Sequence, residues 1–148
     1  MSEHNSQLHD ELIRRSEAEP FGRMLGLEVV QISAGSALVR MRVRPDFENI
    51  FGATHGGALF TLIDEAFQLA CNSHGILSVA LNVSITYAAA PKPGTVLEAC
   101  AREINKTNRT ASYFCEIREQ GGQRLIATAQ ALAYRTGKEI AITNAPKG

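Results

Sequence analysis

Residues 49–68 read NIFGATHGGALFTLIDEAFQ, and this stretch decides the fold. Gly56 and Gly57 precede a segment that is almost wholly apolar, into which the chain places an adjacent Asp64 and Glu65. When residues 58–71 are set at about 100° per residue, apolar side chains cover most of the circumference. A helix that is apolar on nearly every side is typical of a protein core. The pattern therefore predicts one long, buried central helix over residues 58–71.

The polar side chains of this helix form one stripe about 100° wide. Asp64 and Glu65 lie on its opposite edges, and the complete set is Thr61, Asp64, Glu65, Gln68 and Asn72. We expect a sheet to cover the apolar majority of the helix. The stripe is then left to face solvent, another subunit or a pocket.

Segments with a two-residue period flank the helix. Residues 26–32 and 36–44 predict two strands around a turn at residues 33–35, and residues 79–87, 95–104, 111–118 and 125–135 predict four more. Gly121-Gly122 marks a hairpin between the last two. Because short turns join consecutive strands, the pairing is expected to be antiparallel and the fold class α+β.

The N-terminal arm, residues 1–19, predicts a short helix over residues 6–18 that Pro20 ends. Its apolar face is thin, with Leu8 and Leu12 one turn apart, so we expect it to dock loosely. Residues 20–148 are expected to form a single domain, since the length suits one core.

The composition excludes several classes of protein. Fifteen basic and fifteen acidic side chains cancel among 148 residues, so neither a nucleic acid nor an anionic membrane is an expected partner. No run approaches the roughly 18 apolar residues of a membrane span, and the first twenty residues are too polar for a signal peptide. Three cysteines without a CxxC pair favour neither disulfides nor zinc. We expect a cytoplasmic protein.

The paired glycines suit a chemical role. The N-terminus of a helix carries free backbone N–H groups and partial positive charge, which can stabilise the oxyanion of an acyl transfer. Asp64 lies eight residues beyond Gly56, about 12 Å along the helix axis. A site using both therefore needs a substrate lying along the helix or a second chain. A tight turn and a solvated helix face would produce the same pattern, so both interpretations stay open.

The motifs resemble those of hotdog-fold thioesterases of the phenylacetate-pathway (PaaI) type. The resemblance rests on N-x-x-G-x-x-H-G-G at residues 49–57, LID at 62–64 and NS-x-G at 72–75. It extends over residues 20–135 through PF at 20–21, LGL at 25–27, SITY at 84–87 and P-x-PG at 91–94.

This resemblance implies a curved antiparallel sheet wrapped around the central helix. It also implies dimers whose sheets join edge to edge, pairs of dimers that make homotetramers, and active sites at the dimer interface. The implied reaction is hydrolysis of an acyl-coenzyme A thioester. It needs no metal or redox cofactor, and coenzyme A enters only as part of the substrate.

By the motif match, Asp64 is the catalytic carboxylate, either as general base or as nucleophile. Gly56 donates its N–H to the thioester oxygen, and Gly57 leaves room for the acyl group. Asn49 orients the water or the carboxylate. His55 hydrogen-bonds the substrate or fixes the loop, although a lone His at this position is equally suited to capping the helix.

Further positions follow from the same match. Asn82 and Tyr87 border the substrate channel, Tyr87 being equally plausible in the core, and Gln68 is a candidate for the acyl pocket. The turn that would bind coenzyme A contains Lys106, Asn108, Arg109 and Thr110.

Glu65 departs from the family, in which a small hydroxyl or amide residue commonly follows the aspartate. Two outcomes stay open: if both carboxylates are desolvated, the second charge raises the pKa of one of them, or the rotation of about 100° between the two positions sends Glu65 to water or to an interface. Its effect on substrate choice and rate stays open.

Two alternatives remain beside the thioesterase. A hotdog hydratase or dehydratase would use His55 and Asp64 for proton transfer at carbon. A non-catalytic acyl-CoA-binding protein would keep Lys106 and Arg109 without needing Asp64. An aromatic acyl group is suggested by the family alone.

Overall fold

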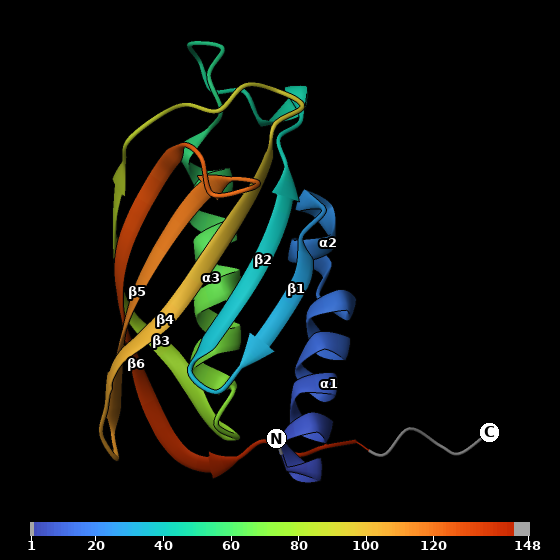
Figure 1. The fold of residues 1–148 in the computed structure, drawn as a ribbon, viewed down its shortest axis with the longest axis vertical. Helices are drawn as coiled ribbons and strands as arrows, with labels where there is room; N and C mark the ends of the chain where they lie inside the picture. Colours follow the sequence, from blue (N-terminus) through green and yellow to red (C-terminus); the bar gives the residue numbers. More distant parts are fainter. Residues whose placement is uncertain (1, 144–148) are drawn as a thin grey trace, which may run out of the picture.

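The long helix α3 (Gly56–Asn72) lies inside the curve of a six-stranded sheet in this computed structural model, which describes residues 2–143 (Figure 1). It begins two residues before the predicted range and ends one residue after it. Its buried side chains include Leu62, Ile63, Ala66 and Phe67. The prediction of a buried central helix is confirmed.

The sheet is antiparallel throughout, with the strand order β1-β2-β4-β5-β6-β3. After β2 the chain passes through α3 before it forms β3. Strand β3 pairs with the last strand, β6, and lies at one edge of the sheet. This arrangement confirms the α+β class. The strands are β1 (Glu28–Ser33), β2 (Ser36–Arg42), β3 (Ile76–Tyr87), β4 (Val96–Lys106), β5 (Thr110–Glu119) and β6 (Leu125–Glu139).

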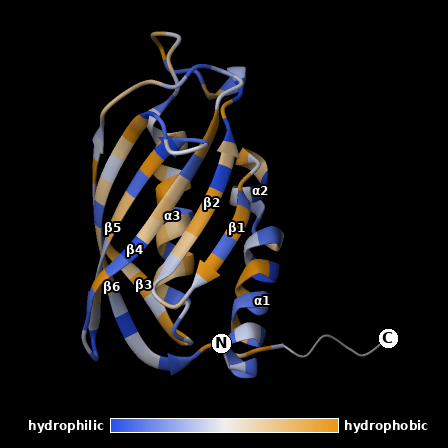
Figure 2. Ribbon diagram, in the orientation of Figure 1, coloured by the Kyte–Doolittle hydropathy of each residue, from blue (hydrophilic) through white to orange (hydrophobic). Residues whose placement is uncertain are grey.

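The core lies between α3 and the inner face of the sheet. Buried and less buried positions alternate along β2, β4 and β5, as expected for strands with one face against a core. Figure 2 shows this alternation as bands of orange and blue on the strands, while α3 is largely orange. Buried alanines line β6 at positions 127, 129, 131 and 133.

The N-terminal arm is more firmly packed than the sequence indicates. Helix α1 (Glu3–Ala18) buries Leu8 and Leu12, and it also buries the carboxylate of Glu11. Arg14 and Arg15 donate hydrogen bonds of 2.7–3.0 Å to that carboxylate. The expectation of loose docking is wrong, because a paired charge extends the buried face beyond the apolar residues.

Pro20 ends α1 and also begins a second helix, α2 (Pro20–Leu25), which the sequence reading missed. Proline suits the first position of a helix because its fixed φ is helical and its missing N–H would have no partner there. Gly26 closes α2 with a φ of 72°. Figure 1 shows α1 and α2 beside β1.

Strand β3 has an open edge, since β6 lies on one side and no strand of residues 2–143 lies on the other. Leu77, Val79 and Leu81 are exposed along it. Among the described helices, none combines the length and the apolar character needed to cross a bilayer.

Candidate active site

The start of α3 is organised by His55. This residue is the N-cap, and its Nδ1 accepts the backbone N–H of Gly57 at 2.8 Å. The N–H of Gly56 makes no hydrogen bond within residues 2–143. One free amide therefore stands at the helix N-terminus, where the dipole favours a negative oxygen.

Side chains of the same chain also lie close to both glycines. The hydroxyl of Tyr87 donates to the carbonyl of Gly56 at 3.1 Å, and a Cβ on Gly56 would lie 3.0 Å from the Tyr87 ring. A Cβ on Gly57 would lie 3.0 Å from Nδ1 of His55. Tyr87, 48% exposed, covers the helix start and does not lie in the core.

Asn49 shapes the loop before α3. Its Oδ1 accepts the N–H groups of Phe51 and Ala53 at 2.9 and 3.1 Å, so only its Nδ2 is left for a water or a substrate. The tip of this loop presents Ile50 and Phe51 almost fully to solvent. The proposed role of Asn49 in orienting water stays a prediction.

Asp64 is the carboxylate of α3 with free lone pairs. It is half-buried, and its side chain makes no hydrogen bond within the described part of the chain. Burial raises its pKa above the usual value, and the negative charge of Glu19 raises that pKa further. A carboxylate that is unpaired and more basic than usual can accept a proton from water.

Glu65 points toward the N-terminal arm. It is 4% exposed, accepts the hydroxyl of Ser16 at 2.5 Å and accepts the amide of Gln68 at 2.8 Å. Burial raises its pKa to about 6. Of the two alternatives for Glu65, exposure to water or an interface is wrong, because α1 covers this part of α3; the alternative of a desolvated carboxyl with a raised pKa agrees with the structure.

Two cavities border the polar stripe of α3. The first, about 410 Å³, touches Gly57 and Thr61 and has the apolar walls Phe21, Met24, Leu25 and Phe47. The second, about 310 Å³, touches Gln68 and Asn72 and is bordered by Ser16, Glu19, Leu77 and Val79. Asp64 lies on the turn of α3 between them.

The predicted coenzyme-binding turn joins β4 to β5. Lys106 ends β4 and Thr110 begins β5, with Thr107 Oγ1 accepting the N–H groups of Arg109 and Thr110 at 3.2 and 3.0 Å. Arg135 also holds this turn, because it donates to the carbonyl of Thr107 at 2.7 Å. No motif marked it, because its position depends on the pairing of β5 with β6.

The predicted site residues do not all meet in one protomer. His55, Gly56, Gly57 and Tyr87 are in contact, but the β4–β5 turn with Asn108 lies at the opposite end of the sheet from the start of α3 (Figure 1). Asn82 borders a separate hollow of about 270 Å³.

The end of α3 is held by the side chains of Asn72 and Ser73, which belong to the NS-x-G motif at residues 72–75. Asn72 Oδ1 accepts the N–H of Ser78 at 2.9 Å, and its Nδ2 donates to the Ser78 carbonyl at 3.1 Å. Ser73 accepts the N–H of Gly35 and donates to the carbonyl of Ala70, both at 2.7 Å. These residues therefore attach α3 to the β1–β2 turn and to β3.

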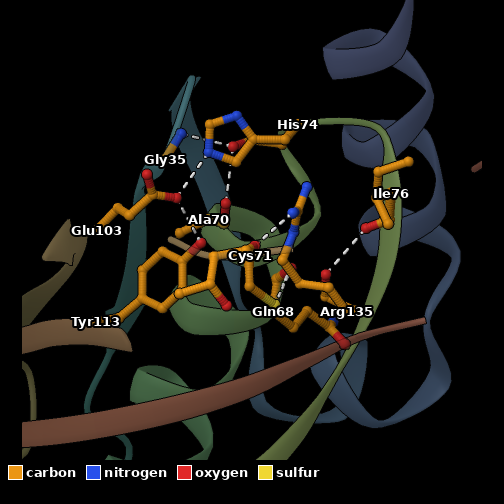
Figure 3. Close-up of polar contacts among 12 residues, drawn as sticks. Gly35, Gln68, Ala70, Cys71, His74, Ile76, Glu103, Tyr113 and Arg135 are labelled. Atoms are coloured by element: carbon orange, nitrogen blue, oxygen red, sulfur yellow. Dashed lines mark hydrogen bonds and ion pairs between the residues drawn. The ribbon is translucent and has the colours of Figure 1, made fainter. Parts of the chain in front are cut away.

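His74 continues this structural cluster, as Figure 3 shows. Its Nε2 lies 2.7 Å from Oε2 of Glu103, which also accepts the hydroxyl of Tyr113 at 2.9 Å. Burial alone would raise the pKa of Glu103, but the hydrogen bonds from His74 and Tyr113 outweigh it and lower that pKa. In residues 2–143, no three side chains of His, Cys, Asp or Glu gather as metal ligands.

Known proteins match this arrangement in sequence and in structure. The model of the thioesterase superfamily matches residues 51–126, about half of the chain. The acyl-coenzyme A thioesterase PaaI of Escherichia coli K12 is 32% identical over 124 residues, covering 84% of this chain and 88% of that protein.

Solved structures agree with this match. The structure of the E. coli PaaI protein from the phenylacetic acid degradation operon aligns with a TM-score of 0.86 at 28% identity, covering 93% of this chain and 99% of that one. The protein smu.793 of Streptococcus mutans UA159, bound to acetyl-CoA, aligns with a TM-score of 0.73 at 29% identity, covering 78% and 92%.

These matches confirm the hotdog fold that the motifs imply. They also confirm that the enzyme is a thioester hydrolase. The chain belongs to the thioesterase superfamily, as a hotdog-fold protein of the PaaI type.

Proposed function

We propose that this enzyme hydrolyses an acyl-CoA thioester with Asp64 as its catalytic carboxylate and the Gly56 N–H as oxyanion donor. One observation carries the proposal: Asp64 is a half-buried carboxylate with no hydrogen-bond partner in the described chain, on the polar face of an otherwise buried helix. The acyl-CoA thioesterase PaaI and the acetyl-CoA-bound S. mutans protein support coenzyme A as the carrier of the acyl group.

In the general-base route, Asp64 takes a proton from water as the water oxygen attacks the thioester carbon. The carbonyl oxygen becomes an oxyanion, which the Gly56 N–H and the helix dipole stabilise. The C–S bond then breaks, and the coenzyme thiolate takes up a proton. In the nucleophilic route, Asp64 attacks the same carbon and the C–S bond breaks, which expels the coenzyme thiolate and leaves a mixed anhydride; water then hydrolyses the anhydride to the free acid and regenerates the Asp64 carboxylate.

The separation between Gly56 and Asp64 favours a site shared by two chains. The two residues are about 12 Å apart along α3, and the β4–β5 turn lies at the other end of the sheet. Two copies joined along their β3 edges would place Asp64 of one protomer near the helix start of its partner. The exposed Val79 and Leu81 support this edge as the dimer interface. Tetramers would be pairs of such dimers.

The acyl group is proposed to occupy the cavity of about 410 Å³ at the start of α3. Phe21, Met24 and Phe47 give it apolar walls that suit a hydrocarbon or aromatic acyl group. The polar β4–β5 turn would hold the phosphates of coenzyme A through Lys106 and Arg109.

The test is release of free thiol from phenylacetyl-, hydroxybenzoyl-, acetyl-, hexanoyl- and palmitoyl-CoA, with wild type and Asp64→Asn side by side. We expect kcat of the variant to fall by at least about 10², the usual effect of removing a general acid–base group. Asp10→Asn, an exposed aspartate of α1, is the matched control and should retain wild-type rates.

Near-wild-type turnover by Asp64→Asn would contradict the proposal. Coenzyme A binding that is unaffected by the variant, without turnover of any thioester, would favour the non-catalytic binder. Hydration of an enoyl-CoA in place of hydrolysis would favour the hydratase.

A further inference from the structure

The corner between α1 and α2 is connected to the catalytic helix by a chain of hydrogen bonds. The Nε2 of Gln68 donates both to Oε2 of Glu19 and to Oε2 of Glu65, each at 2.8 Å. The hydroxyl of Ser16 completes the chain at the other oxygen of Glu65. Two residues of the N-terminal arm are thus fixed against the polar face of α3.

This connection places Glu19 beside Asp64. Gln68 follows Asp64 by one helical turn on the same face, so a side chain bound to Gln68 lies over that face. Ser16, Glu19 and Gln68 also border the cavity of about 310 Å³. Asp64 itself has no hydrogen bond that would fix its basicity, which leaves it open to nearby charge.

Within residues 2–143, the arginines that border the two cavities beside Asp64 are already paired. The guanidinium of Arg15, which borders the cavity of about 310 Å³, is already bound to Glu11 and to the carbonyl of Ala141. Arg44, which borders the cavity of about 410 Å³, pairs with Asp46.

The remaining titratable neighbours are neutral or lose their charge early. Toward the sheet lie the thiols of Cys71 and Cys115, and burial raises the pKa of both to about 12, which keeps them neutral. Glu65, whose pKa is raised to about 6, loses its charge early as the pH falls.

We propose that Glu19 is a positioning residue of the hydrolysis: held by Gln68, it places a negative charge beside Asp64 and makes that carboxylate a stronger base. The inference rests on the proposed role of Asp64. A neighbouring negative charge favours the protonated form of a carboxyl group, and the direction of the Asp64 pKa agrees with this geometry. The N-terminal arm would then take part in catalysis without touching the substrate.

The experiment compares Glu19→Gln with Glu17→Gln, which removes the same charge two residues earlier. Glu17 is exposed and makes no hydrogen bond or ion pair within residues 2–143. The Asp64 carboxyl is titrated by ¹³C NMR, and the acid limb of kcat/KM is measured on the best acyl-CoA of the panel. Glu19→Gln should move both midpoints to lower pH by about half a unit or more, as expected for a unit charge several Å away. Glu17→Gln should move neither.

A second variant distinguishes the effect of the Glu19 charge from a defect in folding. Gln68→Met releases Glu19 while keeping its charge, so it should shift the Asp64 midpoint in the same direction. Unchanged midpoints in both variants, with native circular dichroism, would overturn the inference. Failure of the proposed function is distinguishable, because turnover by Asp64→Asn would remove Asp64 from catalysis while the NMR titration would still report its coupling to Glu19.

Discussion

The hydroxyl of Tyr87 lies 3.1 Å from the carbonyl oxygen of Gly56, and its ring occupies the space into which a side chain at position 56 would project. The end of β3 thereby fixes the start of α3. The size of residue 56 is therefore constrained by a contact within its own chain.

Gly56→Ala is expected to be destabilising because the new methyl group would lie 3.0 Å from the Tyr87 ring. Because Tyr87 is 48% exposed and its ring can shift, the loss of unfolding free energy should lie at the low end of overpacking costs, about 1 kcal/mol. In the Tyr87→Ala background the same substitution should cost clearly less, which a double-mutant cycle by urea denaturation would measure. Equal costs in both backgrounds would show that Tyr87 is not the reason for the glycine.

His55→Ala should lower the unfolding free energy by about 1 kcal/mol, since the Gly57 N–H loses its acceptor. His55→Asn supplies a good N-cap, so we expect it to restore both Tm and kcat/KM. Thermal melts and thiol release would be measured on the same preparations. If Tm returned while kcat stayed low, His55 would act directly on the substrate and not through the helix.

Glu11 makes the docking of α1 sensitive to acid. Hydrogen bonds from Arg14 and Arg15 lower the pKa of its carboxyl from 4.5 to about 2. Because the folded pKa is below the unfolded value, the ionised form stabilises the fold above pH 4.5, and this contribution is lost as pH falls toward 2.

Glu11→Gln should therefore lower Tm by a few degrees at pH 7, and its difference from wild type should shrink between pH 4.5 and 2. Scanning calorimetry over this range is the measurement, with Glu17→Gln as the exposed control. A Tm difference that stays constant with pH would contradict the assignment.

Most of the fold could be predicted from the sequence because its signals are local. The apolar circumference of residues 58–71 and the period of the strands each depend on neighbours in the chain. The docking of α1 could not be predicted, since Glu11 accepts the hydroxyl of Thr143, 132 positions away, and Arg15 donates to the carbonyl of Ala141, 126 positions away. Pro20 was read only as a helix stop, although proline suits the first position of a helix equally well.

The candidate site likewise combines local contacts, which the sequence can indicate, with contacts between distant residues, which it cannot. Contacts between near neighbours, such as His55 with Gly57, lie within one short motif. The contact of Tyr87 with Gly56 spans 31 positions, and those of Gln68 with Glu19 and Glu65 with Ser16 each span 49. No periodicity in the chain encodes these distant pairs. The sequence therefore leaves the surroundings of Glu65 open, and the structure shows that the N-terminal arm covers it.

The open edge of β3 is where we expect a second copy of the chain to pair. Leu81 is 56% exposed on this edge strand, and a charged side chain there should oppose pairing with a second copy. We expect Leu81→Lys to reduce the oligomer seen by light scattering and to lower kcat/KM by at least about tenfold, because positioning across the interface would be lost. Val30→Lys, at a 39% exposed position on the other edge strand, β1, is the matched control and should leave both unchanged. An active Leu81→Lys monomer would show that one chain contains the complete site.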